Sequence, residues 1–485
     1  MPEKKCDPSE LRAETQPALD QSKFPMDIGE MYEGERIRKP DLYAEFGGVD
    51  IPEKFELVLV RPMEEVQDGR VEVVGPDLPK LQIGGAYPLG ILIEVSGSKL
   101  DRDIEGVLER RVHYFTNYIE GVMHVNQRTD VWIRISKKSF ERGMKSLAWV
   151  GRALILLFKR SLPIVEKIQV TFFTDPAKIE ERLREAVKVY NARDERARGL
   201  TEEEVDAFYS CVLCQSFAPS HVCIITPNRM GGCGSISWFD ARASSNVDPK
   251  GPNFPVMKGD CLDSVKGIYT GVNKVVQDRS LGAVQQISLH SLFDHPHTSC
   301  GCFESIAFYV PEVDGVAIVH RDFKGPTVNG LTFSTMAGHT SGGTQNEGFL
   351  GMAIEYMRST KFIQADGGWK RVVWMPQQIK DRLKEAIPTG MRDLIATEND
   401  AKTAGELKEF LKSKNHPVIE RWAELEKAEK EPVPETGREV PPETLPALIP
   451  AGLEIPAVGG GFKIILKNAK ITAERVIIKR EDSRK

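Results

Sequence analysis

The pattern of hydrophobic and polar positions divides the chain after about residue 54 into short strands and longer helices. Segments 55–60, 89–95, 131–135 and 168–173 are short, apolar or β-branched, and bounded by Pro, Gly, Ser or Asp, which predicts strands. Apolar residues recur every three or four positions in 104–119 and 139–158, which predicts helices. Strands and helices therefore alternate over residues 54–175, as in a layered α/β domain.

After residue 175 the pattern changes to a charged helix and then a second domain. Opposite charges at helical spacing predict a solvated connecting helix over 176–200. Thr201 and Glu204 have the spacing of a capping box, so we expect the second domain to cover 201–430. Its predicted helices are 347–357, 377–386, 404–411 and 418–427, and its predicted strand is 372–374. The fold class is therefore multidomain, α/β to α+β: a layered α/β middle domain followed by a mixed α+β domain.

Both ends of the chain have a different character. Residues 1–53 are polar and rich in Pro and Gly, which predicts a loosely attached lead-in. Six prolines in 431–450 predict an extended linker. Residues 451–485 contain two segments, 462–466 and 471–478, that are typical of a small paired β tail.

Length and charge exclude some classes of function. A chain of 485 residues exceeds what one core usually organises. Its 65 basic and 70 acidic residues give 65 − 70 = −5, which argues against a nucleic-acid-binding surface. The most apolar helix, 147–158, is too short to cross a membrane and predicts a buried helix. Since the N-terminal residues lack the apolar stretch of a secretory signal, we expect a reducing cytoplasm in which thiols are free to bind metal.

Six of the eight cysteines form two groups. The first group comprises Cys211, Cys214, Cys223 and Cys233. Four thiols this close together in a cytoplasmic protein predict a zinc or an iron-sulfur site. Zinc sites commonly use two CxxC pairs, whereas gaps of nine and ten positions follow the first pair here, a spacing that a four-iron cubane tolerates. Cys6 and Cys261 stand apart, and we expect them to bind no metal.

The second group is Cys300-Gly301-Cys302. Its two sulfurs and the amide nitrogens of Gly301 and Cys302 can close a square of chelate rings around one metal. Nitrogen and sulfur in a square plane indicate nickel(II) or copper(II). A side chain at Gly301 would crowd this flattened backbone. The outward lone pairs of the two thiolates can bridge to a second metal.

Two runs carry a family resemblance: YSCVLCQSFAPSHVCIITPNRMGGCGS, 209–235, and HTSCGCFE, 297–304. They resemble the metal-centre signature of the acetyl-CoA synthases, and in particular of the β subunits of archaeal acetyl-CoA decarbonylase/synthase (carbon monoxide dehydrogenase/acetyl-CoA synthase) complexes. The likeness covers about 89–430. It implies one 4Fe-4S cluster held by Cys211, Cys214, Cys223 and Cys233, and two nickel ions, proximal and distal.

The same resemblance assigns further roles. Cys214 would also bridge the cluster to the proximal nickel, and Cys300 and Cys302 would link the two nickels. The distal nickel would complete its square with the backbone nitrogens of Gly301 and Cys302. Phe217 would lie over the proximal nickel and shape the space for a small ligand, so the expected catalytic residues are Cys214, Cys300, Cys302 and Phe217.

The segment WIRIS, 132–136, matches the part of the family that is associated with coenzyme A. Alternation along a strand puts Trp132 and Arg134 on one face, where they could bind adenine and a phosphate. A buried Trp beside a structural Arg is the alternative. We expect His295 and His297 to be hydrogen-bonded loop histidines, and Gly338, Gly342 and Gly343 to belong to a flexible loop.

The resemblance implies an acyltransferase that reversibly assembles acetyl-CoA from a corrinoid-bound methyl group, carbon monoxide and coenzyme A. Its expected partners are carbon monoxide dehydrogenase subunits and a corrinoid iron-sulfur protein, with no nucleic acid and no membrane. Two alternatives remain open at the level of sequence: an iron-sulfur electron-transfer or scaffold subunit of such a complex, and a zinc-stabilised structural subunit.

Overall fold

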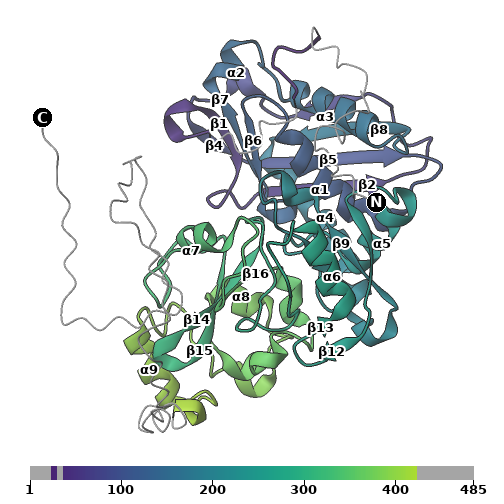
Figure 1. Cartoon of the computed structure of the whole chain (residues 1–485). Coiled ribbons are helices and arrows are strands. Elements are labelled where there is room, and N and C mark those ends of the chain that lie inside the picture. Colours follow the sequence, from purple (N-terminus) through teal and green to yellow (C-terminus); the bar gives the residue numbers. More distant parts are fainter. Residues whose placement is uncertain (1–22, 30–36, 423–485) are drawn as a thin grey trace, which may run out of the picture. The chain divides into compact units, whose positions relative to one another are not determined.

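The computed structural model describes residues 23–29 and 37–422. Predictions for the linker 431–450, the tail 451–485, Cys6 and the end of helix 418–427 lie outside the described residues; the described start of that helix is at residue 419. The described part contains several sheets and helices (Figure 1), which confirms a mixed α and β, multidomain-like architecture.

A four-stranded sheet with helices on both faces forms the α/β part. Its order is β2 (Lys54–Val60), β5 (Leu89–Ser96), β8 (Lys167–Phe173) and β3 (Val71–Val74). In β2, alternate residues Phe55, Leu57 and Leu59 pack in the core with helix α4 (Pro176–Arg198), whereas Val58 belongs to the core with helices α1 (Glu105–Thr116) and α3 (Leu147–Ser161). Because both faces are covered, β2 reads as a nearly continuous apolar run.

Three predicted strands of this sheet and the connecting helix are confirmed. The predicted helix 139–158 is interrupted. Helix α2 (Lys137–Glu141) ends before Gly143, whose φ is +116°, and α3 begins after Ser146, whose side chain accepts a hydrogen bond from the N–H of Ala148. The apolar periodicity therefore spans two helices with a sharp turn between them.

A second sheet has the order β4 (Gly85–Tyr87), β1 (Leu42–Gly47), β7 (Trp132–Ser136) and β6 (Val122–Val125). Strand β7 confirms the prediction for 131–135. Strand β1 lies within 1–53, and the expectation of a loosely attached lead-in is wrong for this segment. Its sequence LYAEFG is mostly apolar and buried, and it pairs with both β4 and β7.

The cysteine-bearing part begins at the predicted capping box of Thr201 and Glu204, which caps a short 3-10 helix, Glu202–Glu204. A three-stranded sheet follows, with β9 (Ala207–Cys211) between β10 (Cys223–Ile225) and β11 (Asn253–Met257). Helix α5 (Trp238–Val247), hairpin β12–β13 (Cys261–Asp263 and Ile268–Tyr269) and helix α6 (Thr270–Arg279) complete this region.

The last sheet has the order β16 (Phe349–Met352), β14 (Ser305–Val310), β15 (Gly315–His320) and β17 (Val372–Trp374). Strand β17 and helices α8 (Gln377–Arg382) and α9 (Ala404–Ser413) confirm three predictions, and α7 (Phe333–Thr340) was not predicted. The predicted helix 347–357 is wrong: β16 pairs with β14 there, and a 3-10 helix, Ile354–Arg358, follows. Close approach of Gly351 to Phe303 requires the absence of a side chain in this strand.

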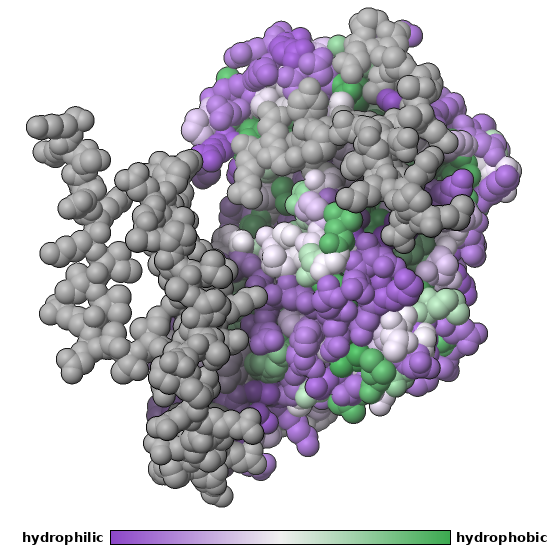
Figure 2. Space-filling model, viewed as in Figure 1, coloured by the Kyte–Doolittle hydropathy of each residue, from purple (hydrophilic) through white to green (hydrophobic). Residues whose placement is uncertain are grey.

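The surface on the face seen in Figure 2 is largely hydrophilic, with separate hydrophobic patches. Exposed large hydrophobic residues include Met257, Leu262 and Val265, at the end of β11 and around hairpin β12–β13. None of the described helices is long and apolar enough to cross a membrane.

Candidate metal centre

Strand pairing places the first two thiols side by side. Cys211 ends β9 and Cys223 begins β10, and the antiparallel register makes them direct partners. Residues that are direct partners point to the same face of a sheet, with Cβ atoms about 4.5–5.5 Å apart. Two of the predicted ligands are thus positioned by backbone hydrogen bonds alone.

Cys214 lies in a 3-10 helix, Leu213–Ser216, that is separated from β9 by Val212. The backbone N–H groups of Phe217 and Ala218 both donate to the Cys214 carbonyl, at 3.3 and 2.9 Å. With three residues per turn, Phe217 returns to the side of the helix that carries Cys214. The prediction that Phe217 lies near the thiols agrees with its packing against Cys214, Cys300 and Cys302.

Cys233 projects from a tight loop after β10. The N–H of Gly231 donates to the Ile236 carbonyl at 2.9 Å, and the N–H of Gly234 to the Gly231 carbonyl at 2.8 Å. The side-chain amide of Gln127, from the α/β part, donates to the Cys233 carbonyl at 2.7 Å. The loop is therefore fixed both by its own backbone and from outside.

Three hydrogen bonds bring the distant segment 297–304 to these cysteines. The N–H of Ile224 in β10 donates to Nε2 of His297 at 2.9 Å, and His221 shares a hydrogen bond of 3.0 Å with Thr298. At the other end, the N–H of Glu304 donates to the Gly232 carbonyl at 3.2 Å. Cys300-Gly301-Cys302 lies between these anchors, shortly before β14.

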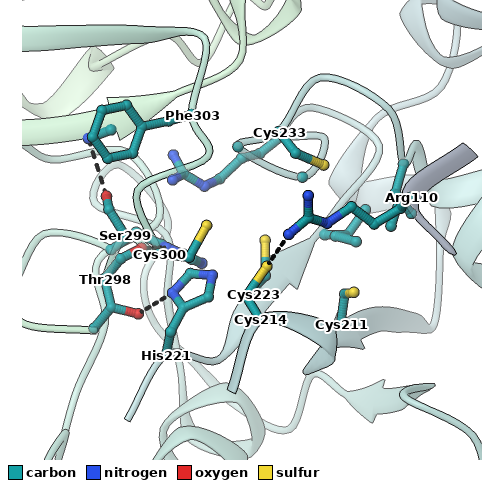
Figure 3. A pocket seen from close by; sticks show the side chains of 17 residues that line it. Arg110, Cys211, Cys214, His221, Cys223, Cys233, Thr298, Ser299, Cys300 and Phe303 are labelled. Atoms are coloured by element: carbon teal, nitrogen blue, oxygen red, sulfur yellow. Dashed lines mark hydrogen bonds between the residues drawn. The ribbon is translucent and has the colours of Figure 1, made fainter. Parts of the chain in front are cut away.

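All six predicted cysteines meet at one place, and Figure 3 shows five of them. A pocket is lined by Cys211, Cys214, Cys223, Cys233 and Cys300. Its atom-free volume is about 460 Å³, part of which is open to solvent. Cys302 packs against Cys214 and Cys300. In contrast, Cys261 is exposed on β12. The donor set therefore fits thiophilic metals such as iron and nickel.

Gly301 has a backbone conformation that favours glycine. Its φ is +116°, and a Cβ there would lie 3.1 Å from the Cβ of Ser341. The N–H of Cys302 lies 3.3 Å from Sγ of Cys300 and points to it. One nitrogen and one sulfur of the predicted square are thus already neighbours.

Cys211 and Cys223 are hard to ionise without a cation. Burial raises the pKa of Cys223 to about 12, and burial also raises the pKa of Cys211. Metal binding removes thiol protons because the cation stabilises the thiolate. Proton release is therefore expected to accompany metal uptake.

Helix α1 contributes two polar side chains that the sequence analysis did not identify. Nη2 of Arg110 lies 2.9 Å from Sγ of Cys214 and 3.6 Å from Sγ of Cys302. His113, one turn later, has Nε2 at 4.0 Å from Sγ of Cys302. Helix α1 buries several polar residues: Glu105, Glu109, Arg110 and His113. Charged residues on the core face of an amphipathic helix are unusual, and this pattern could have identified them from the sequence.

A buried chain of polar groups leads away from His113. Nδ1 of His113 shares a hydrogen bond of 3.0 Å with Nδ1 of His124, whose Nε2 lies 2.6 Å from Oε2 of Glu56. Burial and then the charge of Arg110 lower the pKa of His113 to about 3, and burial lowers that of His221 to about 4. His113 and His221 are thus neutral near pH 7.

Comparison with known proteins decides the family. Residues 24–179 match the family described as CO dehydrogenase/acetyl-CoA synthase complex beta subunit, and residues 190–423 match the family of the C-terminal part of the ACS/CODH beta subunit. The chain is 51% identical over 466 residues to acetyl-CoA decarbonylase/synthase complex subunit beta 2 of Methanocaldococcus jannaschii, covering 94% of this chain and 97% of that one. It is 52% identical to the subunit beta of Methanopyrus kandleri, covering 95% and 98%. The chain belongs to this beta-subunit family.

A smaller solved structure, the C-terminal domain of an acetyl-coenzyme A synthase alpha subunit, is 40% identical to this beta-subunit family member. The match covers 25% of this chain and 96% of that domain, with a TM-score of 0.23.

The predicted coenzyme A contacts of this beta-subunit family member have partners within the chain. Arg134 stacks on Trp132, with its guanidinium carbon 4.4 Å from the ring centre, which agrees with their placement on one face of β7. Nε of Arg134 is 2.5 Å from Oε2 of Glu45, and Nη1 donates to the Ile37 carbonyl at 2.9 Å. A role in binding coenzyme A stays a prediction.

A second group of possible ligands, Asp130, His320 and Asp322, does not suit a metal. Nη2 of Arg321 lies 2.5 Å from Oδ2 of Asp130, so this carboxylate already has a cation. The N–H of Asp322 donates to Nδ1 of His320 at 3.2 Å, which puts the ring hydrogen of a neutral His320 on Nε2, facing Asp130 at 3.7 Å. Asp130 of this beta-subunit family member therefore forms an ion pair with Arg321 beside His320.

His297 and the predicted glycine loop both contact the cysteine segment. His297 is a hydrogen-bonded histidine, as expected, but it is buried and holds β10 against the segment before Cys300. Gly338 lies within helix α7, so the expectation of a loop is wrong for this residue, whereas Gly342 and Gly343 follow the helix. The N–H of Gly343 donates to the Ser299 carbonyl at 2.9 Å. The glycine loop thus supports the cysteine segment.

Proposed function

We propose that this chain is an acyltransferase, an acetyl-CoA synthase/decarbonylase that reversibly assembles acetyl-CoA from a corrinoid-bound methyl group, carbon monoxide and coenzyme A. The observation that carries the proposal is the convergence of six cysteines from two distant segments, with Gly301 in a backbone conformation that favours glycine. Relatives of the same length, about half identical in sequence, are named as subunits of acetyl-CoA decarbonylase/synthase complexes.

Under this proposal the cysteines divide between two groups of metals. Cys211, Cys214, Cys223 and Cys233 would hold one 4Fe-4S cluster, and Cys300, Gly301 and Cys302, with Cys214, would hold two nickel ions. When bound, these metals supply the joining of methyl and carbonyl groups and their transfer to the thiol of coenzyme A. The chain places the thiols, and Phe217 packs beside them to limit the space for a ligand.

The proposed partners follow from the same assignment. They are carbon monoxide dehydrogenase subunits, a corrinoid iron-sulfur protein as methyl donor, and coenzyme A and carbon monoxide as small molecules. The proposed location is the cytoplasm, where thiols stay reduced. If Trp132 and Arg134 contact coenzyme A, the variant Trp132→Leu should have a higher KM for coenzyme A and an unchanged melting temperature.

The test combines metal analysis with an exchange assay. Wild-type protein is expected to contain about four irons and two nickels per chain, and to exchange labelled carbon monoxide into the carbonyl carbon of acetyl-CoA. Cys300→Ala removes one predicted nickel ligand and is expected to lose nickel and exchange while retaining iron. Cys261→Ala, which changes an exposed thiol outside the centre, is the matched control and should behave as wild type.

Other results would point to the alternatives. Wild-type protein that contains iron but no nickel would favour an electron-transfer or scaffold subunit. Zinc without iron would favour a structural subunit. Full exchange activity in Cys300→Ala would show that the chemistry occurs elsewhere.

A further inference from the structure

Arg110 is a buried cation that reaches the cysteines from the α/β part of the chain. It is 1% exposed, and its Nη2 lies within 3.6 Å of sulfurs from two segments, Cys214 after β9 and Cys302 before β14. Figure 3 shows its guanidinium directed toward the thiol of Cys214. Within the described part of the chain, Nη1 has no hydrogen-bond partner.

The carboxylates nearest to Arg110 along its own helix are already paired. Arg193 from α4 lies 2.8 Å from Oε2 of Glu105 and 2.6 Å from Oε1 of Glu109. A guanidinium stays charged at every relevant pH, and burial without a counter-charge is costly. The thiolates of the metal centre are therefore the groups that balance the charge of Arg110.

We propose that Arg110 is a positioning residue of the metal centre: a fixed counter-charge for the thiolates of Cys214 and Cys302 that raises the reduction potential of the centre. This inference rests on the proposed function, because it requires the metals to be bound. A nearby cation stabilises the reduced form, which carries one more negative charge than the oxidised form. Hydrogen bonds to ligand sulfurs act in the same direction.

The experiment measures the midpoint potential of the iron-sulfur signal by reductive titration, with iron and nickel analysis of the same samples. Arg110→Met removes the charge at similar length, and Arg110→Lys keeps it. The matched control is Arg152→Met, which removes the same charge from an exposed position on α3.

Arg110→Met is expected to lower the midpoint potential. At a fixed solution potential its reduced-to-oxidised ratio should fall by about tenfold or more, because a unit charge a few ångströms from the thiolates interacts strongly at an effective dielectric constant of about 20. In Arg110→Lys and Arg152→Met this ratio should stay within about twofold of wild type. The first variant keeps a positive charge at position 110, and the second leaves Arg110 itself in place. If Arg110→Met is isolated without iron while Arg110→Lys holds it, the inference is also supported.

Three results would overturn the assignment. They are equal potentials in metal-loaded wild type and Arg110→Met, equal falls in Arg110→Met and Arg110→Lys, and equal metal loss in both variants. Failure of the proposed function would look different, because wild type itself would then lack nickel or the iron cluster.

Discussion

Gly301 separates two buried cysteines while being exposed itself. Its φ of +116° is rarely adopted by other residues, and a Cβ would lie 3.1 Å from Ser341. We predict that Gly301→Ala lowers the free energy of unfolding by about 1–3 kcal/mol and weakens nickel binding, while iron is retained. Thermal unfolding and metal analysis of the same sample check both parts.

Gly330→Ala is a control for the backbone penalty alone. Gly330 also has a positive φ, +78°, but a Cβ there would meet no heavy atom within 4 Å. We expect a loss of about 1 kcal/mol with unchanged nickel and iron. Normal nickel content in Gly301→Ala would contradict the chelate at this position.

For individual residues, the spacing of the cysteines predicts six thiols that the structure brings together, and the family resemblance predicts Phe217 beside them. Arg110 and His113 could not be predicted in the same way. Their contacts with Cys214 and Cys302 join residues about one hundred to two hundred positions apart, and no local pattern encodes such a contact.

Helix α1 and the loop that carries Cys233 touch through a glycine. A Cβ at Gly106 would lie 2.2 Å from the carbonyl oxygen of Ser235 and 2.8 Å from a carboxylate oxygen of Asp240. Ala normally stabilises a helix relative to Gly, but here the backbone contact reverses the sign. We predict that Gly106→Ala lowers the free energy of unfolding by about 1–3 kcal/mol, measured by urea titration.

Gly338→Ala, in helix α7, separates this clash from helix propensity. A Cβ at Gly338 would meet nothing within 4 Å. We expect this variant to be stabilised by about 0.5–1 kcal/mol. Equal effects of the two substitutions would mean that α1 can move away from the loop without cost.

Elements with regular hydrophobic periodicity and recognisable boundary residues, such as β2, α4 and β17, are predictable from sequence. Residues 349–352 are not, because FLGM fits an apolar helix pattern as well as a buried strand. Pairing with β14, a contact far along the chain, decides between them.

Glu202 connects separate parts of the molecule. This fully buried carboxylate lies 3.1 Å from His290, accepts a hydrogen bond of 2.6 Å from Thr226, and is 3.4 Å from Nζ of Lys361. Burial alone would raise the pKa of Glu202, but His290, Thr226 and Lys361 lower it to about 2. The two later segments, around 290 and 361, are thereby tied to the cysteine-bearing part.

The lowered pKa fixes the sign of a pH effect. The contribution of Glu202 is present above its unfolded pKa of about 4.5 and is lost as pH falls toward 2. Glu202→Gln should lower the free energy of unfolding by roughly 3 kcal/mol at pH 7, and this difference should shrink below about pH 4.5. Denaturant titrations of both proteins from pH 7 to pH 3 measure it.

Glu203→Gln is the matched control, because Glu203 pairs with the same Lys361 but is mostly exposed. We expect a small effect on stability, since exposed ion pairs contribute little. A constant difference between wild type and Glu202→Gln at every pH would contradict the role of the charge.

The predicted boundary at residue 200 illustrates the limit of sequence reading for the whole molecule. One apolar core contains residues on both sides of it, from Met26 to Leu289, including Cys211 and Cys233. Charge along α4 predicts a solvated connector, yet Ile179, Ala186 and Tyr190 pack against β2. The division into domains stays a prediction, because composition does not reveal which cores merge.

The order of the cysteines along the chain has a consequence for how the protein matures. Cys211, Cys214, Cys223 and Cys233 belong to one hairpin and the loop after it, whereas Cys300 and Cys302 arrive only when a much longer stretch closes. Short loops close at lower entropic cost than long ones. Under the proposed assignment, the iron ligands therefore come together before the nickel ligands, and we expect a chain that holds iron but no nickel to be an intermediate of assembly as well as a product of loss.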